Sequence, residues 1–216
     1  MRNSRVANLI AGLTFCAAGL TLYLATHSLP PPLERRPHEA AGATMAAEAL
    51  SLLKPGGQIM VITRDTTSFS HPETDLQLRS FTKAITAAHV AIAATQTLQV
   101  DPLRPIEVPA GDFFEWIRKT PAGSVIVSFM GPPLLTEAQI AQLGDIKPKI
   151  VAFCPGVLPQ QIDLRRLFES KLLHSAVISR LERPKLATKP KDAQGWFDSC
   201  FRIVNAANVG SLYAAP

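Results

Sequence analysis

The sequence predicts an α/β fold, in which a three-layer, Rossmann-like or flavodoxin-like sheet of about five parallel strands is covered by helices on both faces. Short apolar runs rich in β-branched residues alternate with helix-forming segments along most of the chain. Strands that are apolar throughout are typical of a parallel sheet buried on both faces. Glycine and proline turns separate many of these segments. Right-handed crossovers wind such units into a doubly wound sheet.

The first part of this pattern supplies two helices and two strands. Residues 44–53 (TMAAEALSLL) are good helix formers and end at a Pro-Gly-Gly turn. Residues 58–63 (QIMVIT) follow as a short buried strand. Apolar side chains recur at helical spacing over residues 73–88, which predicts a helix there. Residues 89–100 (HVAIAATQTLQV) are predicted to form the second strand.

The middle of the chain contains two patterns that are typical of helix starts. In a capping box, two side chains three residues apart satisfy free N–H groups at the start of a helix. The pairs with this spacing are Asp112 with Glu115, before a helix to residue 119, and Thr136 with Gln139, before a helix to about residue 143. Strands are predicted at residues 124–130 (SVIVSFM) and 149–154 (KIVAFC).

The last part of the chain is expected to complete the sheet and add one helix. Pro159 suits the first turn of a helix that continues to about residue 170. Residues 172–179 (LLHSAVIS) form the fifth predicted strand. A basic, solvated linker then leads to an amphipathic helix over residues 193–206. Its apolar face carries Trp196, Phe197, Cys200, Phe201 and Val204.

The segment before the predicted domain is apolar enough to be a membrane anchor. Residues 6–26 contain no charged side chain, and a bilayer core needs about 20 apolar residues in helical form. Arg2 and Arg5 precede this run and favour a cytoplasmic N-terminus. We therefore expect a single-pass protein of the inner membrane whose domain lies in the periplasm. The alternative is a cleaved signal peptide, although the run is longer than a typical signal sequence.

These features divide the chain into four regions. They are a transmembrane anchor at residues 1–27, a proline-rich spacer at 28–43, an α/β domain at 44–180, and a basic linker with a C-terminal helix at 181–216. The net charge is +5, but the positive residues are dispersed, so nucleic acid is not an expected partner.

Nothing in the sequence indicates a cofactor or a metal ion. A GxGxxG motif after a strand and a GxxxxGK[ST] loop are both missing, which disfavours nucleotide chemistry. The five histidines are scattered without metal-ligand spacing. Cys154 and Cys200 are interpreted as buried thiols, with a disulfide between them as the alternative.

Candidate ligand-binding residues follow from the fold class. In parallel α/β sheets, ligands bind beyond the carboxyl ends of the strands. The residues expected there are Arg64, Asp65, Ser68, Gly131 and Cys154. As an alternative, Cys154 precedes a Pro-Gly turn, where a thiol activated by a nearby helix N-terminus and a base such as His71 would act as a nucleophile.

Residues 46–180 resemble one lobe of a type I periplasmic binding protein of the sugar-binding kind. The similar segments are GGQIMVITRD, LQLRSFTKAI, SVIVSFMGPPLLTEAQIAQL, KIVAFCPG and LLHSAVISR, with WFDSCFRIVNAANV resembling the tail of that family. The resemblance implies non-covalent capture of a small polar, sugar-like solute, without enzymatic activity. Members of that family close two lobes around the ligand, whereas this chain has the length of one.

These observations lead to one main expectation and two alternatives. The main expectation is a membrane-anchored solute-binding or sensing module, whose second half-site comes from a homodimer or from another envelope protein. The first alternative is a structural or interaction subunit of an envelope complex that has lost ligand binding. The second alternative is a cysteine-dependent enzyme.

Overall fold

A computed structural model describes residues 12–23, 33–67, 70–100, 108–144, 147–181 and 188–213. The chain divides into two compact units, residues 1–33 and residues 34–216. In the first unit, residues 12–23 are helical and exposed, while the other residues of the predicted span at 6–26 lie outside the described part. No helix within the described residues combines the length and the apolar character needed to cross a membrane.

The second unit is built on a six-stranded sheet with the strand order β2-β1-β3-β4-β5-β6. The strands are β1 (Ile59–Arg64), β2 (Ile92–Leu98), β3 (Val125–Ser128), β4 (Lys149–Cys154), β5 (Ser175–Ser179) and β6 (Phe201–Val204). Strands β1 to β5 are parallel, and β6 pairs antiparallel with β5. The first five strands therefore have the predicted flavodoxin-like order.

Strand β6 corrects the prediction for the end of the chain. Helix α8 spans Ala193–Cys200, and the four residues after it form a strand where the sequence predicted a continuous helix to residue 206. Phe201, Ile203 and Val204 have the side chains typical of strands. Backbone pairing with β5 therefore overrides the helical spacing of the apolar residues.

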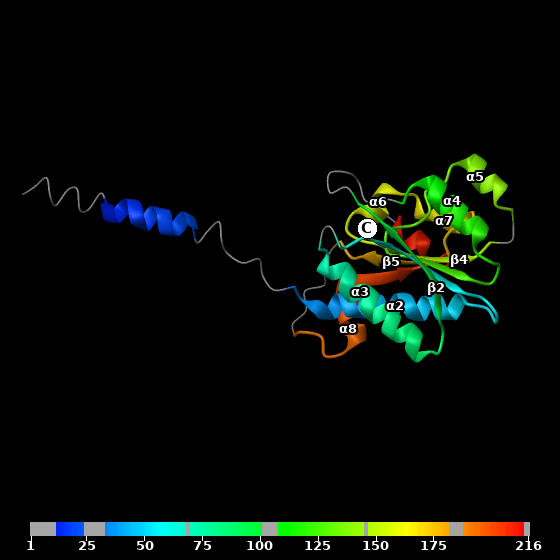
Figure 1. Cartoon of the computed structure of the whole chain (residues 1–216), viewed down its shortest axis with the longest axis horizontal. Coiled ribbons are helices and arrows are strands. Elements are labelled where there is room, and N and C mark those ends of the chain that lie inside the picture. Colours follow the sequence, from blue (N-terminus) through cyan, green and yellow to red (C-terminus); the bar gives the residue numbers. More distant parts are fainter. Residues whose placement is uncertain are drawn as a thin grey trace, which may run out of the picture. The chain divides into compact units, whose positions relative to one another are not determined.

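Helices cover both faces of the sheet (Figure 1). Helices α2 (Arg35–Leu52), α3 (Pro72–Ala87) and α8 lie on one face, and α4 (Ala110–Lys119), α5 (Glu137–Gln142) and α7 (Leu164–Glu169) lie on the other. Two short helices, α6 (Leu158–Gln161) and the 3-10 helix η1 (Val209–Leu212), complete the unit.

Helix α2 begins earlier than predicted, so residues 35–43 are helical and not part of a proline-rich spacer. Pro37 lies in the first helical turn, where the missing N–H would have no helical partner, and proline is therefore tolerated there.

The observed starts of the helices confirm one predicted capping box and differ from the prediction at two other places. The box of Thr136 and Gln139 forms as predicted. Helix α4 has Pro109 as its N-cap and no side-chain cap, so the predicted box of Asp112 and Glu115 is wrong. The single helix predicted from Pro159 is two helices, because Asp163 caps a new helix by accepting a hydrogen bond from the Arg166 N–H.

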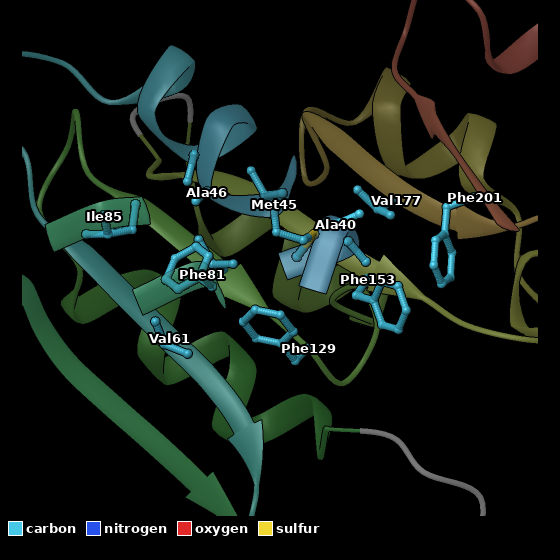
Figure 2. Close-up of a cluster of buried hydrophobic side chains, with 14 of the residues drawn as sticks. Ala40, Met45, Ala46, Val61, Phe81, Ile85, Phe129, Phe153, Val177 and Phe201 are labelled. Atoms are coloured by element: carbon cyan, nitrogen blue, oxygen red, sulfur yellow. The ribbon is translucent and has the colours of Figure 1, made fainter. Parts of the chain in front are cut away.

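The larger helices bury one core between α2, α3, α8 and the sheet (Figure 2). The face that α2 turns inward is made of small residues and Met45, and it includes Ala41, Ala46 and Ala49. Phe81 of α3 meets Phe129 edge to face, with ring centroids 5.5 Å apart. A second core lies between the opposite face of the sheet and α4 and α7, around Phe113 and Leu164.

Gly42 allows α2 to lie directly against α3. A Cβ atom at residue 42 would lie 2.8 Å from the carbonyl carbon of Gln77 and 3.0 Å from its Cα. Such a contact with backbone atoms is relieved only if one helix moves. The close approach of these helices therefore requires glycine at this position.

We expect Gly42→Ala to lower the free energy of unfolding by about 1–3 kcal/mol, because the added methyl group overlaps the backbone of α3. Gly111→Ala is the matched control, because a Cβ at this helical position meets no atom within 4 Å. The control should raise the free energy of unfolding by up to about 1 kcal/mol, since alanine favours helix over glycine. Urea unfolding of the full chain measures both, and equal stabilisation by the two substitutions would contradict this role of Gly42.

Candidate ligand-binding site

A cavity of about 680 Å³ opens at the carboxyl ends of β1, β3 and β4. Its volume lies within the range of about 300–1,000 Å³ typical of small-molecule sites. It is formed by the end of β1 and by the loops that follow β3 and β4, as the fold class predicted. The residues that line it include Arg64, Phe129, Met130, Gly131, Pro132, Leu134, Gly156, Val157, Leu158 and Gln161.

The loop after β3 is shaped by Gly131. Its φ angle of 91° is one that side-chain-bearing residues rarely adopt. A Cβ atom there would also lie 3.1 Å from a methyl group of Leu158 on the facing loop. Phe129 holds the start of this loop through its contact with Phe81 in the core. The backbone at Gly131 therefore lies close to the opposite wall of the cavity.

Arg64 supplies the positive charge of this cavity. It is the last residue of β1, half-buried, and its side chain lines the cavity wall. Burial lowers the pKa of its guanidinium, while the negative charge of Glu73 acts in the opposite direction. The cavity wall thus presents a partly desolvated cation beside a largely apolar surface. Among the described lining residues, the other polar side chain is Gln161.

Two predicted site residues, Asp65 and Ser68, are not among the described residues that line this cavity. The Asp65 carboxylate accepts hydrogen bonds from the hydroxyl and the N–H of Thr67, at 2.7 and 2.9 Å, and these bonds lower its pKa. Asp65 thereby stabilises its own loop and does not line the cavity. Ser68 lies outside the described residues, so its predicted role is not addressed by the structure.

Cys154 lies at the end of β4 but belongs to the second hydrophobic core. Its side chain is fully buried, and it does not line the cavity. Burial raises the pKa of the Cys154 thiol to about 12, opposite to the lowering that the alternative of a nucleophilic cysteine requires. His71, the expected base, instead caps α3, where its ring accepts a hydrogen bond from the Thr74 N–H. This environment disfavours a nucleophilic cysteine.

A second cavity of about 470 Å³ lies beside the first, at the carboxyl end of β5 and the start of the antiparallel strand β6. The two cavities share Gly156, whose N–H donates a 3.0 Å hydrogen bond to Ser179 Oγ. Tyr213 lines the second cavity, and its hydroxyl accepts a hydrogen bond from the Leu164 N–H. Arg180 and Arg202 also line it.

Sequence reasoning located the first cavity and missed the second. The loops after β1, β3 and β4 follow predicted strands, so their place at one edge of the sheet was predictable. Arg202 was assigned to a helix, and this assignment separated it from Arg180. The alternation of apolar and polar residues in Phe201-Arg202-Ile203 was the available signal for a strand. Among the described residues, no group of three histidine, cysteine or acidic side chains is placed to hold a metal ion.

Neither a known family model nor a curated protein matches this sequence. Solved structures, in contrast, share its fold. An arabinose-binding protein from Geobacillus stearothermophilus superposes with a TM-score of 0.52 at 18% identity, over 82% of this chain and 63% of that protein. The sugar-binding protein of a sugar ABC transporter from Bacillus halodurans gives 0.52 at 14% identity, over 82% and 64%. A periplasmic ribose ABC-transporter protein from Conexibacter woesei gives 0.51 at 8% identity, over 83% and 60%.

These similarities define the class of fold. The second unit is a mostly parallel α/β sheet like that of sugar-binding proteins of ABC transporters. At such low identity, the similarity shows the shared fold alone. This chain spans less than two thirds of the length of each of those proteins.

We expect Cys154 to resist alkylation by iodoacetamide at pH 8 in the folded protein, because a pKa near 12 leaves about a thousandfold less thiolate than the ordinary value of 9.0. Cys200 is half-buried and serves as the internal comparison. Peptide mass spectrometry before and after unfolding in urea measures both thiols. Rapid, stoichiometric modification of Cys154 in the folded state would contradict a buried, protonated thiol and would favour the alternative of a cysteine-dependent enzyme.

Proposed function

We propose that this protein is a membrane-anchored, extracytoplasmic module that captures a small polar solute without catalysing a reaction. The observation that carries this proposal is the cavity at the carboxyl ends of β1, β3 and β4, with Arg64 in its wall. Ligands of parallel α/β sheets bind at this edge. The proteins of similar fold include an arabinose-binding and a ribose-transporter protein, which supports a sugar-like solute.

The described wall of this cavity provides only part of the hydrogen-bonding groups that a polar solute needs. A solute with several hydroxyl groups loses its hydrogen bonds to water on binding, and each unpaired hydroxyl costs free energy. Arg64 and Gln161 are the polar side chains among the described lining residues, and most of the remaining wall is apolar. We propose that a second subunit, either another copy of this chain or another envelope protein, closes over the cavity and provides the remaining partners.

The alternative of an interaction subunit without a solute is favoured by one observation. Large apolar side chains are exposed around the two cavities: Val157 is 54% exposed, Leu181 61% and Tyr213 46%. Exposed apolar groups that gather in one area indicate a protein contact surface. In this alternative the same edge of the sheet binds a protein, and the cavities have no ligand.

The proposed anchor rests on residues 6–26 and on the helix at residues 12–23 within them. The described side chains of this helix include Leu13, Phe15 and Leu20, which are 64%, 84% and 60% exposed. An exposed apolar helix is unfavourable in water and favourable in lipid. We propose that this segment spans the inner membrane, with Arg2 and Arg5 on the cytoplasmic side.

A thermal-shift screen of the full chain in mild detergent, against sugars, polyols, nucleosides and amino acids, tests the solute proposal. A ligand that binds the native state raises the melting temperature saturably. For such a ligand, Arg64→Gln should weaken the affinity at least about tenfold, because a hydrogen bond to a charged group is lost. Arg118→Gln is the control, because Arg118 pairs with Glu115 on α4 and does not line the cavity.

The outcomes of this screen separate the two proposals. A saturable shift that Arg64→Gln weakens and Arg118→Gln preserves supports solute capture at this cavity. A cooperative melt that no compound shifts overturns it in favour of the interaction subunit.

Alkaline carbonate extraction of membranes from expressing cells tests the anchor. We expect the full chain to remain with the membrane pellet and a variant that lacks residues 6–26 to appear in the soluble fraction, because the variant has lost the apolar segment. The mass of the mature protein serves as the second readout, since a cleaved signal peptide removes this segment. A soluble, shortened product from the full gene would contradict a retained anchor.

A further inference from the structure

Two arginines, one directly after β5 and one in β6, face the same cavity. Arg202 of β6 lies opposite Ile178 of β5 in the antiparallel register. Arg180 follows Ile178 by two residues, so it lies on the same face of the sheet and diagonally across from Arg202. Diagonal neighbours across two strands are about 7–8 Å apart, within reach of long side chains. Both arginines line the cavity of about 470 Å³.

The backbone fixes one of these side chains in place. Arg180 Nε donates a 3.1 Å hydrogen bond to the carbonyl oxygen of Phe201, and the Arg180 N–H donates to the carbonyl oxygen of Cys200 at 2.7 Å. Arg180 is therefore held against β6, beside Arg202. The terminal nitrogens of a guanidinium bound through Nε still carry N–H donors.

The charges in this cavity are unbalanced. Its described lining contains two guanidinium groups and no aspartate or glutamate. Burial lowers the pKa of Arg202, and the positive charge of Arg180 lowers it further. The Tyr213 ring that lines this cavity also contacts a third arginine, because the Arg165 guanidinium lies 5.1 Å from the ring centre. Like charges held together in a partly buried site repel each other when no counter-charge is present.

An anion bound between the two guanidinium groups would balance their charge. We propose that Arg180 and Arg202 form an anion-binding subsite that holds a carboxylate or phosphate group of the solute captured at this edge. Guanidinium groups donate paired hydrogen bonds that match the oxygens of both anions. The inference rests on the proposed function, because the adjoining cavity at Gly131 and Arg64 then receives the body of the same solute.

The shared position of Gly156 supports a continuous ligand. Gly156 lines both cavities, and glycine adds no side chain between them. The Ser179 hydroxyl fixes the backbone of Gly156 at this boundary. A solute with an anionic group at Arg180 and Arg202 therefore extends into the larger cavity across the backbone of Gly156.

The test uses inorganic phosphate and acetate as probes, with the full chain in mild detergent and ionic strength held constant with sodium chloride. We expect one or both anions to raise the melting temperature of the wild type saturably, by at least 2 °C, a rise of about the size that ligand linkage gives well above Kd. A response to phosphate alone, or to acetate alone, identifies the chemical group that the subsite takes.

Two substitutions test the assignment to these arginines. Arg202→Gln and Arg180→Gln should each abolish most of the anion response, while Arg118→Gln removes the same charge elsewhere and should retain it. Without added phosphate or acetate, Arg202→Gln should melt at or above the wild-type temperature, because its substitution relieves repulsion. A cooperative wild-type melt that neither anion shifts, or an unchanged response in both cavity variants, overturns the anion subsite. Anion-free melting well below the wild type in both variants also overturns it.

Neutral sugars in the same assay distinguish this failure from that of the proposed function. If a neutral sugar shifts the melting temperature and neither anion does, solute capture stands and the anion subsite is overturned. If neither anion and no compound of the wider screen shifts it, both are overturned.

Discussion

The close packing of α2 against α3 and the sheet is the contact on which the larger core depends. A parallel sheet has two apolar faces, and each must be covered before the strands are stable in water. Helix α2 lies over β3, β4 and β5 and contacts both α3 and α8. Its inward face of alanines, glycine and one methionine brings the backbones together. Because α2 contacts two helices and three strands, a shift of α2 disturbs the packing over this whole face of the sheet.

This packing reaches the cavity through aromatic contacts. Phe81 of α3 packs on Phe129, and Phe129 begins the loop that carries Gly131. Within the same core, Phe153 of β4 packs on Phe201 of β6, with ring centroids 5.6 Å apart. Loops that begin at rigid core residues keep their shape without a ligand. The two cavities are therefore positioned by the same core that stabilises the domain.

The sequence predicted the parts of the fold that depend on local patterns. Strand β4 has the predicted bounds, and the order of the parallel strands follows from right-handed crossovers. The capping box at Thr136 was predictable because its residues are neighbours in sequence. Other features depend on distant residues. The strand at Arg202 follows from pairing with the edge of β5. The interpretation of Cys154 as a buried thiol is confirmed, but the same burial removes Cys154 from the predicted site. Residues 35–43 were assigned to a proline-rich spacer because composition alone does not place Pro37 within the first turn of a helix.

The antiparallel strand at the end of the domain has a consequence for synthesis. A ribosome makes β1 to β5 in order, yet α2 at the start of the domain packs against α8 near its end. The cavity at Arg180 also needs Arg202, Leu212 and Tyr213. A nascent chain that stops before residue 200 therefore exposes an unpaired edge of β5 and an uncovered apolar face. Chaperones and proteases recognise exposed apolar surface and unpaired strand edges. Truncated chains are therefore open to degradation, whereas chains long enough to form both cavities are protected.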